Sequence, residues 1–222
     1  MNDLGKAFSS FFKDPQWFSK SAIASLWMLL CLIGIGIPVF IGYLVQVTQR
    51  VMRQETPVLP RWNGIGRKFV IGIKFSIAYI IYLLPIAILL IPVVGLAAMG
   101  AADSESESIP VIMSIYLFGV TLLMIPYGIA LNLVTPILLF RFADRERISD
   151  TVDVVRVVRL FGDNWQNTLI VALISIGVQS LAPAGILIFL IGIFFTMFYA
   201  YVVSAHLGGL LYLAAQNPES RG

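Results

Sequence analysis

The chain has very few of the side chains that carry catalytic or metal-binding chemistry. Its 222 residues include one cysteine, Cys31, and one histidine, His206. A single cysteine forms no intramolecular disulfide, and neither residue has neighbours at metal-ligand spacing. No serine stands in a nucleophile motif, no glycine-rich loop has phosphate-binding spacing, and no carboxylate pair lies within an apolar stretch. The sequence therefore predicts a protein that is not an enzyme and holds neither a metal nor a cofactor.

Charged residues are also scarce, and large parts of the chain have none. They make up 12% of the residues and hydrophobic residues 59%, against roughly 25% and 45–50% in a soluble domain. The stretches 21–49, 75–102, 108–140 and 164–218 contain no Asp, Glu, Lys or Arg. Each exceeds the roughly 20 apolar residues that a membrane-spanning helix needs. We therefore predict an all-α, multi-pass transmembrane bundle that forms a single domain over residues 1–222.

The breaks between apolar runs predict the individual segments of this bundle. Residues 1–20 read as a juxtamembrane segment rich in Phe and Trp, which favour the membrane interface. We expect four to five spans in all, and the clearest are 69–98, 109–140, 166–181 and 186–214.

The first apolar run, residues 21–47, is interrupted by glycines and Pro38 at 34–38. It is either one kinked span or a re-entrant hairpin that returns to the side from which it entered. Each hairpin limb would be about 21 Å long, too short for a full span. We favour the hairpin because it keeps Lys6, Lys13 and Lys20 at the cytoplasmic headgroups.

Residues 150–162 have the periodicity of an amphipathic helix. Val154, Val155, Val158 and Phe161 fall on one side of it, and polar residues fall on the other. A helix of this kind lies on the membrane surface or packs beneath the bundle.

Charge between the apolar runs predicts the orientation of the chain. Residues 48–68 hold five cations and only Glu55 as an acid, whereas residues 99–110 hold three acids and no base. Cytoplasmic loops are enriched in Lys and Arg. We therefore expect a cell-membrane protein with 48–68, 141–164 and both termini in the cytoplasm, and with 103–108 outside.

The same cations are candidates for contact with anionic lipid headgroups. The predicted contact residues are Arg50, Arg53, Arg61, Arg67, Lys68 and Lys74. No basic groove interleaved with aromatic residues is present, so nucleic acid is not an expected partner. Other membrane subunits or a second copy of the chain are possible protein partners.

His206 is the one ionisable residue deep in the last apolar run, which makes it a weak candidate for a functional role. It could hydrogen-bond to a neighbouring helix, ligate a flat macrocycle, or handle a proton or substrate. Gly208 and Gly209 beside it, and Gly72 in an earlier span, are candidates for close helix packing because small residues let backbones approach.

Two function classes fit these features. The first is a non-enzymatic membrane protein that acts through contacts with lipids or partner subunits. The second is a small-solute or lipid transporter that uses helices kinked at proline. A water-filled cavity reaching Asn132 or His206 would favour the transporter. No acid lies in the apolar runs, which argues against ion-coupled pumping.

Several short motifs follow one another in a distinctive order along nearly the whole chain. They are Lys13-Asp14-Pro15-Gln16-Trp17, Gly42-Tyr43, Leu59-Pro60-Arg61-Trp62, Arg141-Phe142-Ala143 and His206-Leu207-Gly208. In this order they resemble a domain-of-unknown-function family of prokaryotic polytopic membrane proteins. They also distantly resemble the membrane domain attached to some glycerophosphodiester phosphodiesterases. The resemblance implies a multi-pass prokaryotic membrane protein with no established activity. The chain departs from the expected pattern at Arg61, where an acidic residue is expected.

Overall fold

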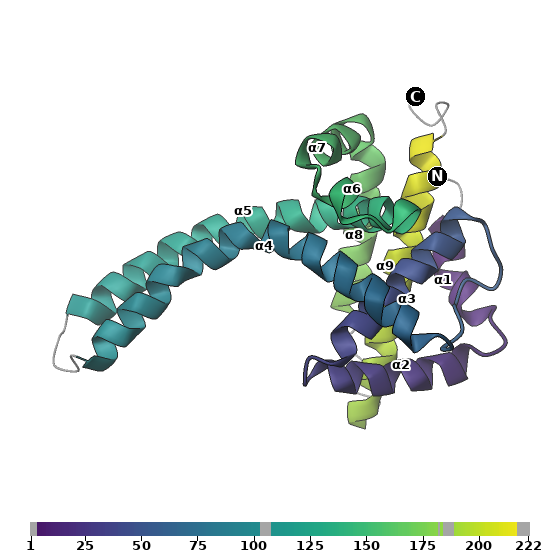
Figure 1. Ribbon diagram of the computed structural model, residues 1–222, viewed down its shortest axis with the longest axis horizontal. Coiled ribbons are helices and arrows are strands. Elements are labelled where there is room, and N and C mark those ends of the chain that lie inside the picture. The colour runs from purple at the N-terminus through teal and green to yellow at the C-terminus, as the bar shows by residue number, and fades with distance from the viewer. Residues whose placement is uncertain (1–3, 103–107, 182, 184–188, 217–222) are drawn as a thin grey trace. The chain divides into compact units, whose positions relative to one another are not determined.

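The computed structural model describes residues 4–102, 108–181, 183 and 189–216, and these form helices joined by short loops, with no strand in those ranges (Figure 1). The predicted acidic segment at 103–107 lies outside the described residues. The helices are α1 (Leu4–Phe12), α2 (Trp17–Cys31), α3 (Gly36–Met52), α4 (Ile65–Ala102), α5 (Ser108–Arg145), α6 (Ile148–Val152), α7 (Val154–Asp163), α8 (Trp165–Ser180) and α9 (Phe189–Gln216).

Three of these helices are long and apolar enough to cross a membrane. They are α4 and α5, with 38 residues each, and the part of α9 from Gly192 to Gln216. These helices indicate a membrane protein and confirm the all-helical prediction. α8, with 16 residues, and α2, with 15, are shorter.

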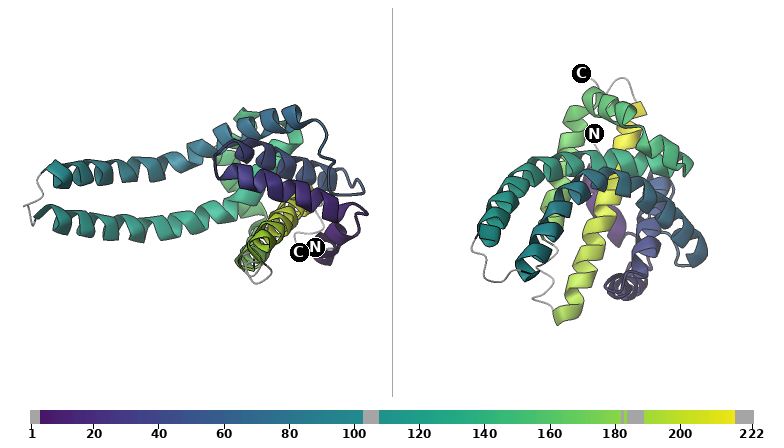
Figure 2. Two further views of the ribbon diagram at one scale, coloured as in Figure 1. Left: turned by 90° about the horizontal axis from the view of Figure 1, so that it is seen from below. Right: turned by 60° about the vertical axis from the view of Figure 1, so that its left-hand side comes forward.

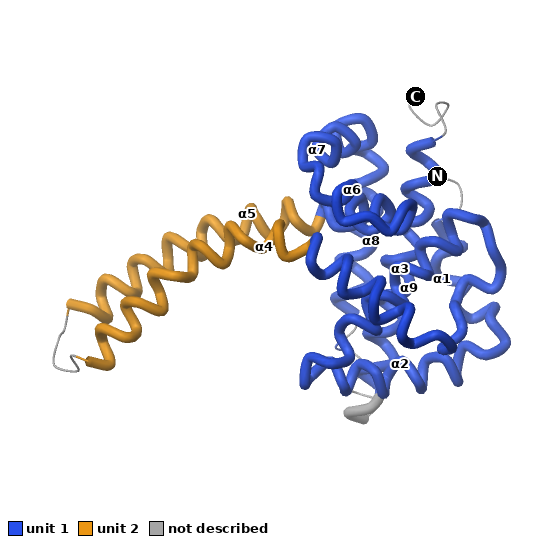
Figure 3. The backbone as a smooth tube through the Cα atoms, viewed as in Figure 1, with its two compact units in different colours: residues 1–78, 133–222 blue, residues 79–132 orange. Residues whose placement is uncertain are grey.

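The described chain divides into two compact units (Figure 3). Unit 1 comprises residues 1–78 and 133–222, and unit 2 comprises residues 79–132. The division falls within α4 and α5, so each of these helices contributes to both units.

In unit 1, helix α9 is packed against α1, α2, α3 and α8 (Figures 1 and 2). The core on this side is rich in aromatic residues. The rings of Phe11, Phe40 and Tyr43 all lie within 6.3 Å of the ring of Phe198 on α9. The apolar side chains of α9 thus face several helices at once, which explains why α9 is apolar all round.

Residues 21–47 form two helices rather than one kinked helix. α2 and α3 pack against each other and are joined by a tight turn at 32–35. Gly34 has a φ of +83°, which glycine adopts without strain. A Cβ on Gly36 would collide with the carbonyl oxygen of Trp27, so glycine is required for the two helices to approach.

The predicted amphipathic helix is α7. It starts at Val154 rather than at 150, because the side chain of Asp153 accepts a hydrogen bond from the N–H of Arg156 at 3.1 Å. Val157 is buried, whereas Val154, Val155 and Val158 are at least half exposed. Within unit 1 the apolar side of α7 is therefore not covered.

Unit 2 is an antiparallel pair formed by parts of α4 and α5, which lie side by side (Figure 3). Two tyrosines of α5 donate hydrogen bonds to carbonyls of α4, Tyr116 to Leu89 at 2.8 Å and Tyr127 to Tyr82. Each acceptor lies three residues before a proline of α4, Pro92 and Pro85. A neighbouring helix thus supplies donors in the turns that the prolines disturb.

Candidate functional site

A hollow of about 510 Å³ gathers the cations that the sequence singled out in residues 48–68. We call it the basic hollow. It lies in unit 1 between the end of α3, the loop that follows, and the start of α4. Its lining residues are Gln46, Gln49, Arg50, Arg53, Glu55, Pro60, Arg61, Asn63, Gly64, Arg67 and Lys68. The lining carries five cations and one carboxylate.

Two of the five cations are held by backbone carbonyls. The Lys68 ammonium donates to the carbonyls of Arg61 and Asn63 at 2.8 and 2.6 Å, and Lys68 is 2% exposed. The Arg50 guanidinium donates to the carbonyl of Pro57 at 2.7 Å. Lys68 was predicted to contact headgroups. Its ammonium is instead hydrogen-bonded to two carbonyls of the loop, so we do not include Lys68 among the proposed headgroup contacts.

The other three cations of the hollow are exposed. The Arg53 guanidinium lies 3.9 Å from Glu55, and the Arg67 guanidinium lies 3.3 Å from Glu146. The Arg61 guanidinium makes no hydrogen bond or ion pair with any residue that the structure describes. These exposed guanidiniums can present bidentate donors to an anion, which is the geometry that suits phosphate.

A buried ion pair fixes the loop that carries Arg61. The Lys20 ammonium lies 2.6 Å from the Asp14 carboxylate and donates to the carbonyl of Leu59 at 2.8 Å. Both side chains of the pair are buried. The prediction that Lys20 faces lipid headgroups is therefore wrong. Asp14 lies in the break between α1 and α2, and Lys20 lies in α2. Helical periodicity therefore could not predict that the two side chains pair.

Trp62 adds two further contacts to the same loop. Its indole N–H donates to the carbonyl of Lys20 at 2.9 Å. Its ring stacks on Tyr43, with ring centroids 4.3 Å apart and planes inclined by 17°. The Asp14, Gly-Tyr and Leu-Pro-x-Trp motifs thus meet in one place, although they are far apart in the sequence.

The remaining predicted headgroup residue, Lys74, is exposed on α4 but does not line the basic hollow. It lies about two turns beyond Arg67 in the same helix. The structure thus brings five of the six predicted cations together and leaves the sixth apart.

The three glycines predicted to allow helix packing differ in how closely they are approached. A Cβ on Gly72 would collide with the carbonyl of Pro38 on α3, and one on Gly209 would lie 2.6 Å from Cβ of Val51. A Cβ on Gly208 would meet its nearest atoms at 3.7 Å, an ordinary contact distance. Sequence reasoning missed Gly42, where a Cβ would collide with the carbonyl of Lys68.

His206 lies on α9 with its ring largely buried. Its Nδ1 atom is 3.0 Å from the hydroxyl oxygen of Ser10 on α1. This geometry favours helix packing among the three roles considered for the histidine. His206 does not line the basic hollow or either of the two hollows described next.

A second hollow, of about 580 Å³, shares Arg50, Glu55 and Arg61 with the basic hollow. Its other lining residues include Asp14 and Lys20, the buried ion pair. The Arg50 and Glu55 side chains, 3.6 Å apart, therefore stand between the two hollows.

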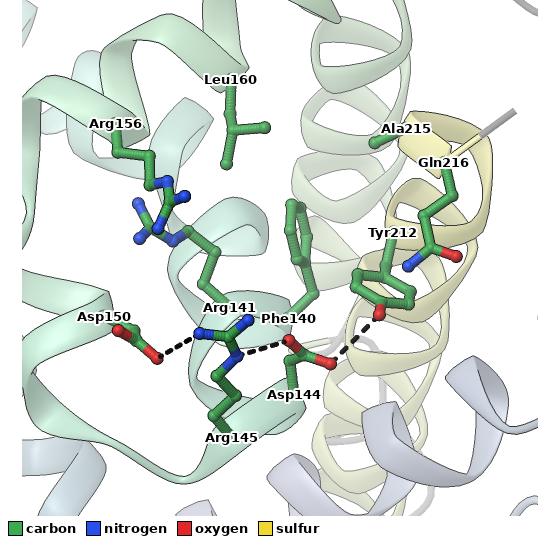
Figure 4. A pocket seen from close by; sticks show the side chains of 10 residues that line it. All are labelled: Phe140, Arg141, Asp144, Arg145, Asp150, Arg156, Leu160, Tyr212, Ala215 and Gln216. Carbon is green, nitrogen blue, oxygen red and sulfur yellow. Dashed lines mark hydrogen bonds and ion pairs between the residues drawn. The ribbon is translucent and has the colours of Figure 1, made fainter. Parts of the chain in front are cut away.

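A third, smaller pocket of about 220 Å³ lies between the ends of α5 and α9 and helix α7 (Figure 4). Arg145 lies between two carboxylates there, 3.6 Å from Asp144 and 3.9 Å from Asp150. The Tyr212 hydroxyl donates to Asp144 at 3.1 Å. Both carboxylates of this pocket thus pair with Arg145.

Within the ranges that the structure describes, no three His, Cys, Asp or Glu side chains lie close enough together to hold a metal ion. Of the three pockets described, the basic hollow has the largest excess of cations over carboxylates. Such a lining is chemically suited to anions.

Comparison with known proteins gives one match. The family described as "Protein of unknown function (DUF4013)" matches residues 25–197, and the chain belongs to this family. No curated protein and no solved structure matches the chain.

Proposed function

We propose that this protein is a multi-pass protein of the cell membrane that acts without catalysis, as an accessory or structural component, through contacts with anionic lipid headgroups and partner subunits. The observation that carries the proposal is the basic hollow, in which five cations and one carboxylate share one lining. Each Lys or Arg near an anionic membrane surface contributes about 1 kcal/mol. The hollow thus concentrates charge that attracts anionic lipids.

The proposed topology has α4, α5 and α9 as full spans, with α8 as a shorter fourth. The α2–α3 pair re-enters from the cytoplasmic side, because a re-entrant pair keeps Lys6 and Lys13 on the same side of the membrane as the basic hollow. Both termini and the basic hollow then face the cytoplasm. α7 lies on the membrane surface, with its exposed valines toward lipid.

Cysteine labelling tests this topology on a Cys31→Ala background. We expect an impermeant maleimide added outside intact cells to label a cysteine at position 104 but not one at position 13. Labelling at position 13 would place the N-terminus outside and contradict the re-entrant pair.

Lipid retention tests the lipid contact. The protein is placed in nanodiscs of phosphatidylcholine and phosphatidylglycerol, and the lipids that remain on release into mild detergent are identified by mass spectrometry. We expect enrichment of phosphatidylglycerol. The variant Arg61→Gln/Arg67→Gln removes two exposed cations and should lower that enrichment by about 30-fold, since two charges contribute about 2 kcal/mol.

A charge-matched control separates the hollow from net charge. The variant Arg147→Gln/Arg159→Gln also removes two exposed cations, from positions outside the basic hollow, and should retain most of the phosphatidylglycerol. Equal loss in both variants would show that the hollow has no special role. Wild-type protein without enrichment would contradict lipid contact altogether.

We do not propose the transporter alternative. Neither Asn132 nor His206 lines any of the three hollows described above, and no other observation favours a transport path.

A further inference from the structure

The basic hollow has the features of a discrete binding pocket and not only of a charged surface. Its volume of about 510 Å³ falls within the roughly 300–1,000 Å³ of small-molecule sites. Its lining comes from α3, the loop at 53–64 and the start of α4, so an occupant would be enclosed by three segments.

The backbone that carries the hollow is held in place from several sides. The loop is tied down by the Lys20 ammonium at Leu59, by the Trp62 indole at Lys20 and by the N–H of Glu55, which donates to the carbonyl of Arg50 at 2.8 Å. Arg50 is itself fixed by the carbonyl of Pro57. Donors that are already positioned lose little freedom when an anion binds.

Glu55 is the one carboxylate in the lining, and it interacts with two of the arginines. Its oxygens lie 3.6 Å from Arg50 and 3.9 Å from Arg53, longer than strong charge-assisted hydrogen bonds of about 2.7–2.9 Å. Its side chain is 43% exposed. Glu55 thus supplies a weakly held internal anion that an incoming anion of higher charge can displace.

We propose that the basic hollow binds one phosphate monoester group, with Arg53, Arg61 and Arg50 as donors and Glu55 as the internal competitor that it displaces. This inference deepens the proposed function, because it names the ligand chemistry of the same surface. A phosphate monoester carries about −1.5 to −2 charges and three acceptor oxygens, which suits a lining with four more cations than acids. The group can belong to a lipid such as phosphatidic acid or to a soluble phosphate ester.

Two measurements distinguish these sources. Isothermal titration calorimetry of the full-length protein in detergent uses glycerol phosphate as the soluble ligand. Nanodiscs containing phosphatidic acid, with phosphatidylcholine nanodiscs as the reference, present the lipid, and native mass spectrometry counts the bound molecules. We expect one saturable site. Binding in both measurements or in the first alone indicates recognition of the soluble group, and binding in the second alone indicates the lipid.

Variants assign the site to the hollow. Arg53→Gln/Arg61→Gln removes two exposed guanidiniums without disturbing the carbonyls that Arg50 holds, and should weaken binding by roughly tenfold or more per arginine. Glu55→Gln removes the competitor and should strengthen binding several-fold. Arg147→Gln/Arg159→Gln is the charge-matched control and should bind like the wild type.

Absence of saturable binding in both measurements would overturn the proposal, as would binding that Arg53→Gln/Arg61→Gln leaves intact. Unchanged or weaker binding in Glu55→Gln would overturn the role of the competitor. The results distinguish failure of the monoester proposal from failure of the proposed function. Phosphatidylglycerol enrichment without a saturable monoester site would contradict the monoester proposal and support lipid contact. A saturable monoester site without that enrichment would support the monoester proposal and contradict lipid contact.

Discussion

The helices within unit 1 pack differently from the helices within unit 2. In unit 1 the helices approach backbone to backbone at Gly36, Gly42 and Gly72, where a Cβ would collide with a neighbouring carbonyl. In unit 2, a Cβ on Gly95, Gly119 or Gly128 would meet no atom within 4 Å, and one on Gly100 would lie 3.3 Å from the side chain of Ile109. Unit 1 therefore depends on close approach between backbones, and these glycines of unit 2 are not approached by a neighbouring backbone.

Polar groups show the same contrast. Unit 1 buries charged side chains, among them Asp14, Lys20 and Lys68, and satisfies them with one another or with carbonyls. In unit 2, the hydroxyls of Tyr116 and Tyr127 on α5 donate to backbone carbonyls of α4. Unit 1 thus encloses charged groups in its core, whereas in unit 2 hydroxyl-to-carbonyl hydrogen bonds join helices whose side chains are mostly apolar.

The largest expected effect comes from filling a close approach in unit 1. Gly42→Ala would place a Cβ against the backbone of Lys68, within 2.6 Å of its carbonyl carbon. Because backbone cannot move aside as a flexible side chain can, we expect no folded unit 1. Reaction of Cys31, which is partly buried against the core, with a fluorogenic thiol reagent reports this unfolding.

Gly95→Ala in unit 2 is the matched control. It adds the same methyl group in open space within a helix, where alanine is the better helix former. Its thiol reactivity should equal that of the wild type, and its thermal midpoint should equal or exceed the wild-type value. A Gly42→Ala protein as stable as Gly95→Ala would show that the close approach is not required.

A smaller loss is expected when the buried ion pair is broken. Lys20→Met leaves the Asp14 carboxylate, 1% exposed, without its partner at 2.6 Å and frees the carbonyl of Leu59. Removal of one member of a buried pair destabilises by about 3–5 kcal/mol. Thermal unfolding in detergent, followed by Cys31 reactivity, measures the loss.

The double variant Asp14→Asn/Lys20→Met should recover part of that stability, because no unpaired charge remains. Lys13→Met, which changes an exposed neighbour, should have no effect. Equal midpoints for Lys20→Met and Lys13→Met would contradict a structural role for the pair.

The sequence predicted the helical class and the long apolar helices, because absence of charge over 28 residues or more is a strong signal for a span. It also predicted the clustering of cations at 48–68, since those residues are close in the chain. The ion pair and Gly42 were missed for one physical reason. Both depend on contacts between segments that are not neighbours in one helix, and periodicity reports only which residues share a face.

Lys68 illustrates the same limit within the site. Its position in a basic stretch predicted an exposed headgroup contact, but α4 approaches α3 at Gly42 so closely that Lys68 is buried there. The loop carbonyls of Arg61 and Asn63 then satisfy its ammonium. A loop that folds back onto a helix cannot be foreseen from local charge.

The smallest expected effect is in unit 2. Tyr127→Phe removes the hydroxyl that donates to the carbonyl of Tyr82, in the turn before Pro85, and hydrogen bonds between membrane helices contribute about 0.6 kcal/mol on average. We expect hydrogen–deuterium exchange in this part of α4 to rise about threefold, with unit 1 unchanged. Ser114→Ala is the control, because its hydroxyl donates to Pro110 within α5 itself. Equal exchange in the two variants would show that unit 2 is held by apolar packing without the tyrosine.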